Sequence, residues 1–326
     1  MTAIIERRLA DCSTTLSAPL GHSGFGSEIH VWAVTLCYAL ERNASLVTTG
    51  SMVWEAACGS SAPPFTCHFG NRANPCFTHR KAAVVALPHW VPQQGRHHPT
   101  INKGYANLTA LKIWEECPTW SVRNGVPFFQ LAMKFLFERL SPRLLESARE
   151  AASITFGRSG APTTLVTVHI RWGDKGKEAE LLPIQRYALA VDSLVRKHRP
   201  GVPAHDIGVF VTTEDRSALT AFTVATAAYG WKVYSHAPSL LQTSGLGEDS
   251  LNMSAAPSRS SSFRIHNPKD EARKLPRNMS AGHHSIVALL LSLEASLYVL
   301  TNSSNWGRLI NEVRLAYAPS SDAVLL

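Results

Sequence analysis

The sequence has 326 residues, more than one ordinary small domain needs, and this length fits two domains of roughly 150 residues each. Hydrophobic residues make up 45% of the chain and charged residues 17%, which excludes an intrinsically disordered protein. The formal net charge of +8 favours an acidic partner such as nucleic acid, a membrane surface or a phosphorylated small molecule.

The amino-terminal segment gives no targeting signal. Its first eight residues already carry charges, and no apolar core follows them, so we do not expect a secretory signal peptide. No apolar run anywhere in the sequence reaches the roughly 18 residues that a transmembrane helix needs. We therefore expect any membrane anchor to lie outside this sequence.

Residues 20–49 begin with a glycine-rich turn that contains Gly24 and Gly26. Apolar residues then recur every three or four positions, which predicts an amphipathic helix over residues 27–42 and a short strand over residues 45–48. Glycines before a helix leave its free N–H groups open to an anion. A tight turn without a ligand explains the same pattern, and the turn alone favours that simpler interpretation.

All six cysteines lie in the first 120 residues, and three of them are nine residues apart in a segment rich in Pro, Gly and Asn. They are Cys12, Cys37, Cys58, Cys67, Cys76 and Cys117. The even number allows a disulfide framework, and a set of reduced thiols is the alternative. Zinc is a weaker third interpretation because no C-x2-C pair occurs.

Residues 50–125 are irregular apart from a strand-like run at 82–87, and a region of this length without regular structure is normally functional or held by disulfides. Two helices follow. The first is predicted over residues 128–140, and the second starts with Ser141 as its N-cap and Pro142 at its first position. We place the boundary between an amino-terminal, acceptor-side lobe (1–160) and a carboxyl-terminal, donor-binding lobe (161–326) after this second helix.

The second half alternates strands and helices. Strands are predicted from residue 165, over 205–213, 231–234 and 297–301, and helices over 183–199, 217–229, 285–294 and 306–318. The Ser-, Gly- and Pro-rich stretch 235–279 is interpreted as a long loop. This order predicts an α/β fold with a parallel, doubly wound sheet.

Polar and charged residues follow three of these strands. The motif HIRWGDK (169–175) ends the first, Thr213-Glu214-Asp215 the second, and Thr301-Asn302-Ser303-Ser304 another. Because the carboxyl ends of parallel strands meet at one edge of a sheet, these residues should converge on one crevice. Arg, Lys and hydroxyl groups there are suited to phosphate binding. A simple ion pair between Arg171 and Asp174 is the structural alternative.

The motif and its surroundings resemble the core α-1,6-fucosyltransferase family. That family has the pattern H-x-R-R-x-D-K, then a Glu-Ala pair, then H-P-I-E-E-Y. This chain has HIRWGDK (169–175), Glu178-Ala179, Pro183-Ile184 and Tyr187 in the same order. Matching pieces continue on both sides, from the Gly24-Phe25-Gly26 turn to Thr301-x-Ser303-Ser304-x-x-x-Arg308. The resemblance covers residues 20 to 318, the catalytic part of such enzymes.

The resemblance implies two Rossmann-like lobes of the GT-B type, with the nucleotide-sugar site in the cleft between them. It implies transfer of fucose from GDP-fucose, with inversion and without a metal, and the sequence indeed has no D-x-D motif. The acceptor would be a glycan or glycoprotein, with α-1,6 transfer to the inner N-acetylglucosamine of N-glycans, in the Golgi or secretory lumen. Nucleic acid is not expected as a partner because the basic residues are scattered and no binding motif appears.

The resemblance also assigns residues to roles. Arg171 would bind the β-phosphate, Glu178 would be the catalytic base, and Lys175 would hold phosphate or assist the base. Asp174 would position the loop. The residues matched to donor binding are His169, Arg171, Gly24, Gly26, Thr213, Glu214, Asp215, Ser303 and Ser304.

The chain departs from the family in four ways. Trp172 replaces the second Arg of the motif, Ala288 replaces an Asp that would contact guanine, and the segment from Lys175 to Glu178 is one residue shorter. The stem helices and the SH3-like module of the animal enzymes are also absent from this sequence. A protein O-fucosyltransferase, a transferase of another nucleotide sugar and an inactive nucleotide- or sugar-binding protein therefore stay open as alternatives.

Overall fold

We describe the protein from a computed structural model, which places residues 2–20, 24–49, 65–76, 83–85, 128–172, 181–236 and 281–326. Within the 50–125 region only residues 65–76 and 83–85 are described, which includes three of the six residues of the strand predicted at 82–87. Nearly all of the loop predicted at 235–279 lies outside the described residues. Cys58, Cys117, Asp174, Lys175 and Glu178 also lie outside the described residues.

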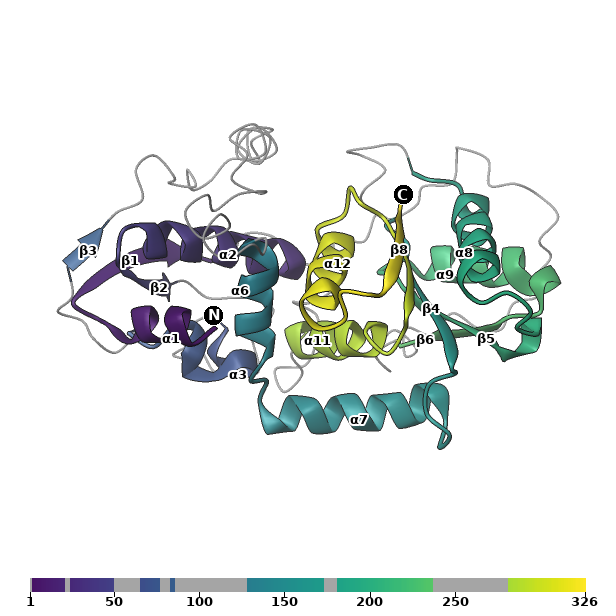
Figure 1. Cartoon of the computed structure of the whole chain (residues 1–326), viewed down its shortest axis with the longest axis horizontal. Coiled ribbons are helices and arrows are strands. Elements are labelled where there is room, and N and C mark those ends of the chain that lie inside the picture. Colours follow the sequence, from purple (N-terminus) through teal and green to yellow (C-terminus); the bar gives the residue numbers. More distant parts are fainter. Residues whose placement is uncertain are drawn as a thin grey trace.

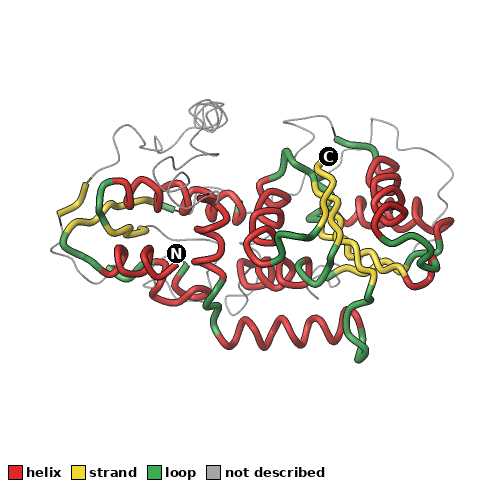
Figure 2. Tube along the Cα trace, in the orientation of Figure 1, coloured by secondary structure: helices red, strands yellow, loops and turns green. Residues whose placement is uncertain are grey.

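The carboxyl-terminal half of the chain contains a parallel sheet of five strands (Figures 1 and 2). In chain order the strands are β4 (Thr164–His169), β5 (Ile207–Thr212), β6 (Lys232–Ser235), β7 (Leu297–Leu300) and β8 (Asp322–Leu325). In space their order is β6-β5-β4-β7-β8, and every neighbouring pair is parallel. The predicted parallel, doubly wound sheet is confirmed.

Helices cover both faces of this sheet because successive residues of each buried strand point to opposite sides. From β4, Val166 and Val168 belong to a hydrophobic cluster under α8 (Ile184–His198) and α9 (Arg216–Thr226). Leu165 belongs to a second cluster, together with buried residues of α11 (Ala281–Ser292) and α12 (Asn305–Tyr317). All six residues of β4 and of β5 are buried, as expected for central parallel strands.

The amino-terminal half contains a smaller parallel sheet, with the order β2-β1-β3 among the described strands. These are β1 (Thr14–Pro19), β2 (Ser45–Thr49) and β3 (Ala83–Val85). The helices here are α1 (Thr2–Ala10), α2 (Phe25–Glu41), the short α3 (Thr66–Phe69) and α6 (Phe128–Phe137). Short 3-10 turns cover Gly70–Ala73 here and Ala204–Asp206 and Ala227–Tyr229 in the other half.

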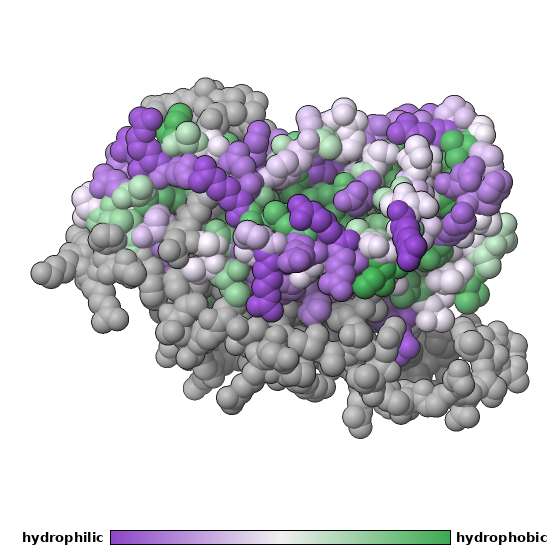
Figure 3. Space-filling model, turned by 90° about the horizontal axis from the view of Figure 1, so that it is seen from below, coloured by the Kyte–Doolittle hydropathy of each residue, from purple (hydrophilic) through white to green (hydrophobic). Residues whose placement is uncertain are grey.

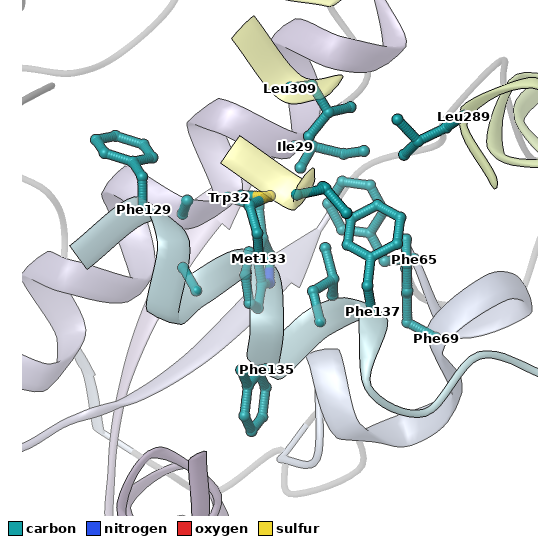
Figure 4. Packing of buried hydrophobic residues seen from close by; sticks show 14 of the residues in the cluster. Ile29, Trp32, Phe65, Phe69, Phe129, Met133, Phe135, Phe137, Leu289 and Leu309 are labelled. Atoms are coloured by element: carbon teal, nitrogen blue, oxygen red, sulfur yellow. The ribbon is translucent and has the colours of Figure 1, made fainter. Parts of the chain in front are cut away.

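One hydrophobic cluster runs through both halves. In Figure 4, Trp32 of α2 and Phe135 of α6 lie on the same core as Leu289 of α11 and Leu309 of α12. Trp32 and Phe135 stack with their ring centroids 6.3 Å apart. The two halves therefore meet through α2, α6 and α12 in an apolar interface that holds the amino ends of α2 and α12 together.

Helix α7 (Pro142–Phe156) lies along the lower side of the molecule in Figure 1, next to α11, and leads from α6 to β4. It starts as predicted, with Pro142 at its first position and the Ser141 hydroxyl accepting the backbone N–H of Leu144 at 3.3 Å.

Seen from below in Figure 3, the described surface mixes hydrophilic residues with smaller hydrophobic areas. The proposed division at residue 160 remains a prediction.

Several predicted boundaries shift. Helix α11 begins at Ala281 instead of residue 285, and the strand predicted over 205–213 is shorter because residues up to Asp206 form a 3-10 turn. Helix α1 and the strands β1 and β8 were not predicted. Strand β8 is short, and both strands are poor in the alternating apolar pattern that marks a strand in a sequence.

The cysteines of the amino-terminal half form disulfides. Cys12, which follows α1, is bonded to Cys76, and Cys37 and Cys67 are disulfide-bonded as well. No cysteine in the described ranges is a free thiol. Of the three interpretations of the cysteines, the disulfide framework is the one that the structure supports.

Candidate functional site

The candidate site lies where the strand order of the five-stranded sheet reverses. Counted along the chain, the spatial order is third, second, first, fourth, fifth, so the chain leaves β4 toward one side of the sheet and later returns to β7 on the other. Ligands of open α/β sheets bind outside the carboxyl ends of the strands at such a point. His169 ends β4, and Thr301 follows β7 directly.

His169 is a central residue of this edge. It is 1% exposed, its Nδ1 lies 3.1 Å from the Thr212 carbonyl oxygen, and its Nε2 lies 3.0 Å from the Ser304 hydroxyl oxygen. Burial lowers the pKa of His169 to about 3, so the ring is neutral at pH 7. Because Nδ1 faces a carbonyl it must donate, and Nε2 then accepts the Ser304 hydroxyl proton. His169 thereby ties the ends of β4 and β5 to the start of α12.

A second chain of hydrogen bonds crosses the switch point. The Thr301 hydroxyl donates to the His169 carbonyl oxygen at 2.8 Å, and Tyr187 of α8 places its hydroxyl 2.9 Å from the Thr301 hydroxyl. The backbone N–H of Arg171 is also hydrogen-bonded to the Tyr187 hydroxyl, and burial raises the pKa of that phenol. Tyr187, which the sequence left without a role, therefore fixes the backbone between β4 and the Arg171 side chain.

Arg171 forms an ion pair with Glu214, the residue that follows Thr213 after β5. The Arg171 guanidinium donates to Glu214 Oε2 at 3.0 Å and to the Trp172 carbonyl oxygen at 2.9 Å. The Arg171 side chain is 17% exposed, whereas that of Glu214 is 51% exposed. A carboxylate thus holds the guanidinium at the edge of the sheet, in a partly covered position where its charge is effective.

Thr213 and Asp215 shape the turn after β5. The Thr213 hydroxyl accepts the Asp215 backbone N–H at 3.2 Å, and Asp215 caps α9 by accepting the N–H groups of Ser217 and Ala218 at 2.8 and 3.2 Å. These are local hydrogen bonds of a helix start. They set the backbone that presents Glu214 to Arg171.

The glycine turn of the amino-terminal half reaches the same edge. Gly24 is the N-cap of α2, and Gly26 lies against the first turn of α12, where an added Cβ would be 3.3 Å from the Asn305 carbonyl. The Ser27 hydroxyl accepts a hydrogen bond from the Asn305 side chain. The glycine turn therefore contacts the start of α12, which follows the end of β7.

The start of α12 is packed unusually closely onto β7. Ser304 is its N-cap, and its hydroxyl accepts the Trp306 N–H at 3.3 Å. A Cβ on Gly307 would overlap the Thr301 carbonyl oxygen and approach His169 Cδ2 to 3.0 Å. Only glycine fits there. A glycine inside the first turn of a predicted helix is the signal that could have identified this residue in the sequence. The neighbouring Ser303 is exposed.

Trp172 and Leu182 mark the two ends of the stretch 173–180, which carries Asp174, Lys175 and Glu178 and is not described. The Trp172 indole N–H donates to the Leu182 carbonyl oxygen at 3.0 Å, and both side chains pack on the cluster under α8. Trp172 and Leu182, which lie on either side of this stretch, are therefore next to each other, beside Arg171. Trp172 therefore has a structural role here, through its hydrogen bond to Leu182 and its packing against the cluster under α8.

We compared the chain with known proteins. No family model and no curated protein matches its sequence. Among solved structures, the fucosyltransferase NodZ from Bradyrhizobium is similar over 93% of this chain and 92% of its own, with a TM-score of 0.52 and 13% identity. POFUT1 in complex with GDP-fucose is 11% identical over 97% of this chain and 99% of its own, with a TM-score of 0.45. A variant of Arabidopsis thaliana FUT1 in complex with GDP is 12% identical over 95% of this chain and 71% of its own, also with a TM-score of 0.45.

The chain has a GT-B-like α/β fold. The similarity to NodZ spans both parallel sheets, which the predicted two-lobed architecture requires. At 13% identity the similarity concerns the fold. The residue roles and the resemblance to the core α-1,6 family therefore remain predictions.

Two further features of the GT-B-like chain concern metals and membranes. Within the described ranges, no group of three or more His, Cys, Asp or Glu side chains is arranged to hold a metal ion. Among the same residues, we find no helix with the length and apolar character needed to span a bilayer.

Ala288, which stands in place of the family's guanine-contacting Asp, lies on α11, where its carbonyl accepts the Ser292 hydroxyl at 2.7 Å.

Proposed function

We propose that this protein is an inverting, metal-independent glycosyltransferase that moves fucose from GDP-fucose to a hydroxyl of a glycan. One observation carries the proposal: the fold resembles that of a fucosyltransferase over nearly its whole length. The cation-bearing edge at its switch point supports it, because a nucleotide diphosphate is the kind of ligand that such an edge binds.

In this proposal Arg171 stabilises the departing GDP. Negative charge grows on the leaving diphosphate as the sugar–oxygen bond breaks, and without a metal the protein must supply the positive charge. Glu214 holds the Arg171 guanidinium in place before the donor arrives, so little reorganisation is needed during the reaction. Glu214 thus supports the donor site through Arg171.

The start of α12 is the second donor contact. Ser303 is exposed at the edge, and the first N–H groups of the helix carry the positive end of its dipole, which suits a phosphate. The Ser304 hydroxyl is already engaged with His169 and with the Trp306 N–H. We therefore assign His169 to positioning Ser304 and α12, and Gly24 and Gly26 to closing the site from the other half.

Glu178 is the proposed base that takes the proton from the acceptor hydroxyl, and Lys175 assists at the phosphate. Both belong to the stretch whose ends are fixed by the contact between Trp172 and Leu182. Inversion needs the base on the side of the sugar opposite to GDP. The acceptor we propose is the inner N-acetylglucosamine of an N-glycan, modified in α-1,6 linkage. The disulfides support an oxidising compartment such as the secretory lumen.

Nucleotide binding tests the donor assignment first. We would titrate the purified protein with GDP, ADP and UDP and then assay GDP-fucose with a panel of N-glycans and a folded glycoprotein domain. We expect selective binding of GDP and transfer to an N-glycan. Absence of GDP binding would refute the fucosyl proposal. GDP binding with transfer to the protein domain alone would identify a protein O-fucosyltransferase, and binding without transfer an inactive protein.

Two substitutions then separate the roles. Arg171→Ala should lower the transfer rate by roughly a hundred- to a thousandfold, because one preorganised charge is lost from the transition state. Glu178→Gln should lower turnover by roughly a hundred- to ten-thousandfold and leave GDP affinity unchanged, because a base acts after donor binding. Arg186→Ala, an exposed arginine on α8, is the matched control and should keep the full rate. A fall in GDP affinity alone in Glu178→Gln would exclude Glu178 as the base.

A further inference from the structure

A separate cavity lies at the opposite edge of the five-stranded sheet. It has a volume of about 430 Å³ and is bounded by the last turn of α8, the residue Ile207 that starts β5, and the turn before β6. The six residues of β5 separate this edge from His169 and Arg171 by about 20 Å. The cavity is therefore independent of the proposed donor site.

One wall of the cavity is aromatic. Tyr229 and Trp231 both line it, and their rings stack with centroids 4.3 Å apart and an interplanar angle of 25°. Both side chains are half-buried. Their polar atoms, the phenol hydroxyl and the indole N–H, bond no other residue in the described part of the chain. The wall thus combines an apolar aromatic surface with two hydrogen-bonding groups that have no partner among the described residues.

Polar side chains at the carboxyl end of α8 line another part of the cavity. The Arg196 Nε donates to Asp192 Oδ1 at 3.0 Å, which places a carboxylate beside a guanidinium. Among the described residues, Arg199 donates to two neutral oxygens only, the His198 carbonyl at 2.9 Å and the Ser296 hydroxyl at 3.3 Å. The cavity therefore offers both a strong acceptor and several donors at its rim.

We propose that this cavity binds a neutral pyranose ring of an oligosaccharide. The C–H face of a sugar is apolar and suits an aromatic wall. Its hydroxyl groups both donate and accept hydrogen bonds, so they match a rim in which Asp192 lies beside Arg196 and Arg199. A phosphate fits less well, since it would meet the Asp192 carboxylate and the negative carboxyl end of α8. The site binds a sugar about 20 Å from the switch point, which is too far for the sugar that reacts.

Chitotriose and maltotriose are suitable neutral probes. We would label the protein with 15N-tryptophan, assign the Trp231 indole signal with the variant Trp231→Leu, and follow that signal during the titrations. At least one trisaccharide should shift it, with a dissociation constant on the order of 1 mM because the contact is small. Saturating GDP should leave this affinity unchanged. If neither trisaccharide moves the signal, or if GDP displaces the sugar, the proposal is wrong.

Matched variants on α8 sharpen the test. Arg199→Gln should weaken sugar binding about three- to tenfold through the loss of one hydrogen-bonding group. Lys197→Gln removes the same charge from the neighbouring position, which does not line the cavity, and should have no effect. Arg199 is exposed, so this comparison holds even if Trp231→Leu is unstable. Equal effects of the two variants, or a shift of the Trp231 signal by inorganic phosphate, would overturn the assignment. Sugar binding at this cavity does not require GDP binding. A protein that fails to bind GDP would refute the proposed fucosyl transfer and leave the sugar-site proposal standing.

Discussion

The two halves of the molecule reach the same kind of fold with different means. In the carboxyl-terminal half, long apolar strands are buried on both sides between helices, as β4 and β5 show. In the amino-terminal half the central strand β1 is TTLSAP, and the core is supplied largely by apolar side chains of α2 and α6, among them the stacked Trp32 and Phe135. The carboxyl-terminal half positions chemical groups at a strand edge, whereas the amino-terminal half depends on helices and covalent links.

Side chains and a disulfide complete the amino-terminal half where its strands are weak. Asn74 acts in place of a neighbouring strand: its amide donates to the Thr48 carbonyl oxygen at 2.9 Å and accepts the Thr48 N–H at 3.3 Å. The nearby bond between Cys12 and Cys76 joins segments 64 residues apart. We therefore expect the two halves to respond differently to the same kind of perturbation.

At the edge of the carboxyl-terminal half, Gly307→Ala is expected to affect both stability and GDP binding. The new methyl group would overlap the Thr301 carbonyl oxygen, so α12 must move. Overpacking of this kind costs about 1–3 kcal/mol and occasionally more, and here it should also weaken GDP binding. Denaturant unfolding and GDP titration measure the two effects.

Gly24→Ala is the control in the amino-terminal half, because a Cβ there meets no atom within 4 Å. Its cost should stay within about 1 kcal/mol, the usual range for a change at an N-cap. If the two glycine variants were equally stable, the close packing of α12 onto β7 would not matter for the fold.

The disulfide tests the amino-terminal half. The double variant Cys12→Ser, Cys76→Ser should lower the free energy of unfolding by about 2–4 kcal/mol, because the unfolded chain regains the freedom that the bond removes. Hydrogen exchange should accelerate around β1 and β2 and stay slow in β4 and β5. Equal acceleration in both sheets would show that the halves unfold as one unit.

Acid should destabilise both halves through buried histidines. Burial lowers the pKa of His68 in α3 and of His169 after β4 to about 3 in each case. Since the folded-state pKa lies below the unfolded value of about 6.5, each histidine contributes its full stability above that pH. The contribution is lost as the pH falls from about 6.5 toward 3, at about 1.4 kcal/mol per pH unit for each ring.

Denaturant unfolding between pH 7 and pH 4.5 measures this slope. His68→Phe removes a titrating ring from the amino-terminal half, and His169→Asn removes one from the carboxyl-terminal half. Below pH 6.5, each variant should reduce the pH dependence of the free energy of unfolding by about 1.4 kcal/mol per pH unit, which corresponds to the uptake of one proton. An unchanged slope in either variant would mean that its histidine is accessible to protons in the folded protein.

The smallest effect is expected where the halves meet. His30 of α2 lies 3.0 Å from Glu312 Oε2 of α12, and the apolar core around this pair is extensive. Glu312→Gln keeps a hydrogen-bonding group and should cost less than about 1 kcal/mol. Glu6→Gln, which removes the exposed pair with Arg139 inside the amino-terminal half, is the control and should change little. Separate unfolding of the two halves in Glu312→Gln would show that this pair, and not the apolar core, joins them.

The sequence predicted the carboxyl-terminal half well because its pattern is local. Runs rich in β-branched residues mark β4 and β5, an apolar run marks β7, and each is followed by a helix with a clear apolar face. The strands β1 and β8 escaped prediction because neither contains a long apolar run: their sequences are TTLSAP and DAVL. The pairing of Cys12 with Cys76 could not be derived either, since six cysteines allow 15 pairings.

The candidate site was predictable in position and only partly in detail. Parallel strand ends must share an edge, so the meeting of His169, Arg171 and Ser304 followed from the order of elements. The hydrogen-bonding partners of these residues did not follow from that order. That Glu214 holds Arg171, and that Tyr187 bridges to Thr301, depends on side-chain directions across neighbouring elements. Both are long-range contacts that no spacing rule in the sequence reveals.

The hydrogen bond between Trp172 and Leu182 has a consequence for how such proteins diverge. With both ends of the intervening stretch held at one point, residues can be gained or lost there without shifting the register of β4 or α8. Even a doubling of its length would cost only about 0.6 kcal/mol in closure entropy. A change in the length of this stretch should therefore affect the proposed placement of Lys175 and Glu178, and not the packing of β4 and α8.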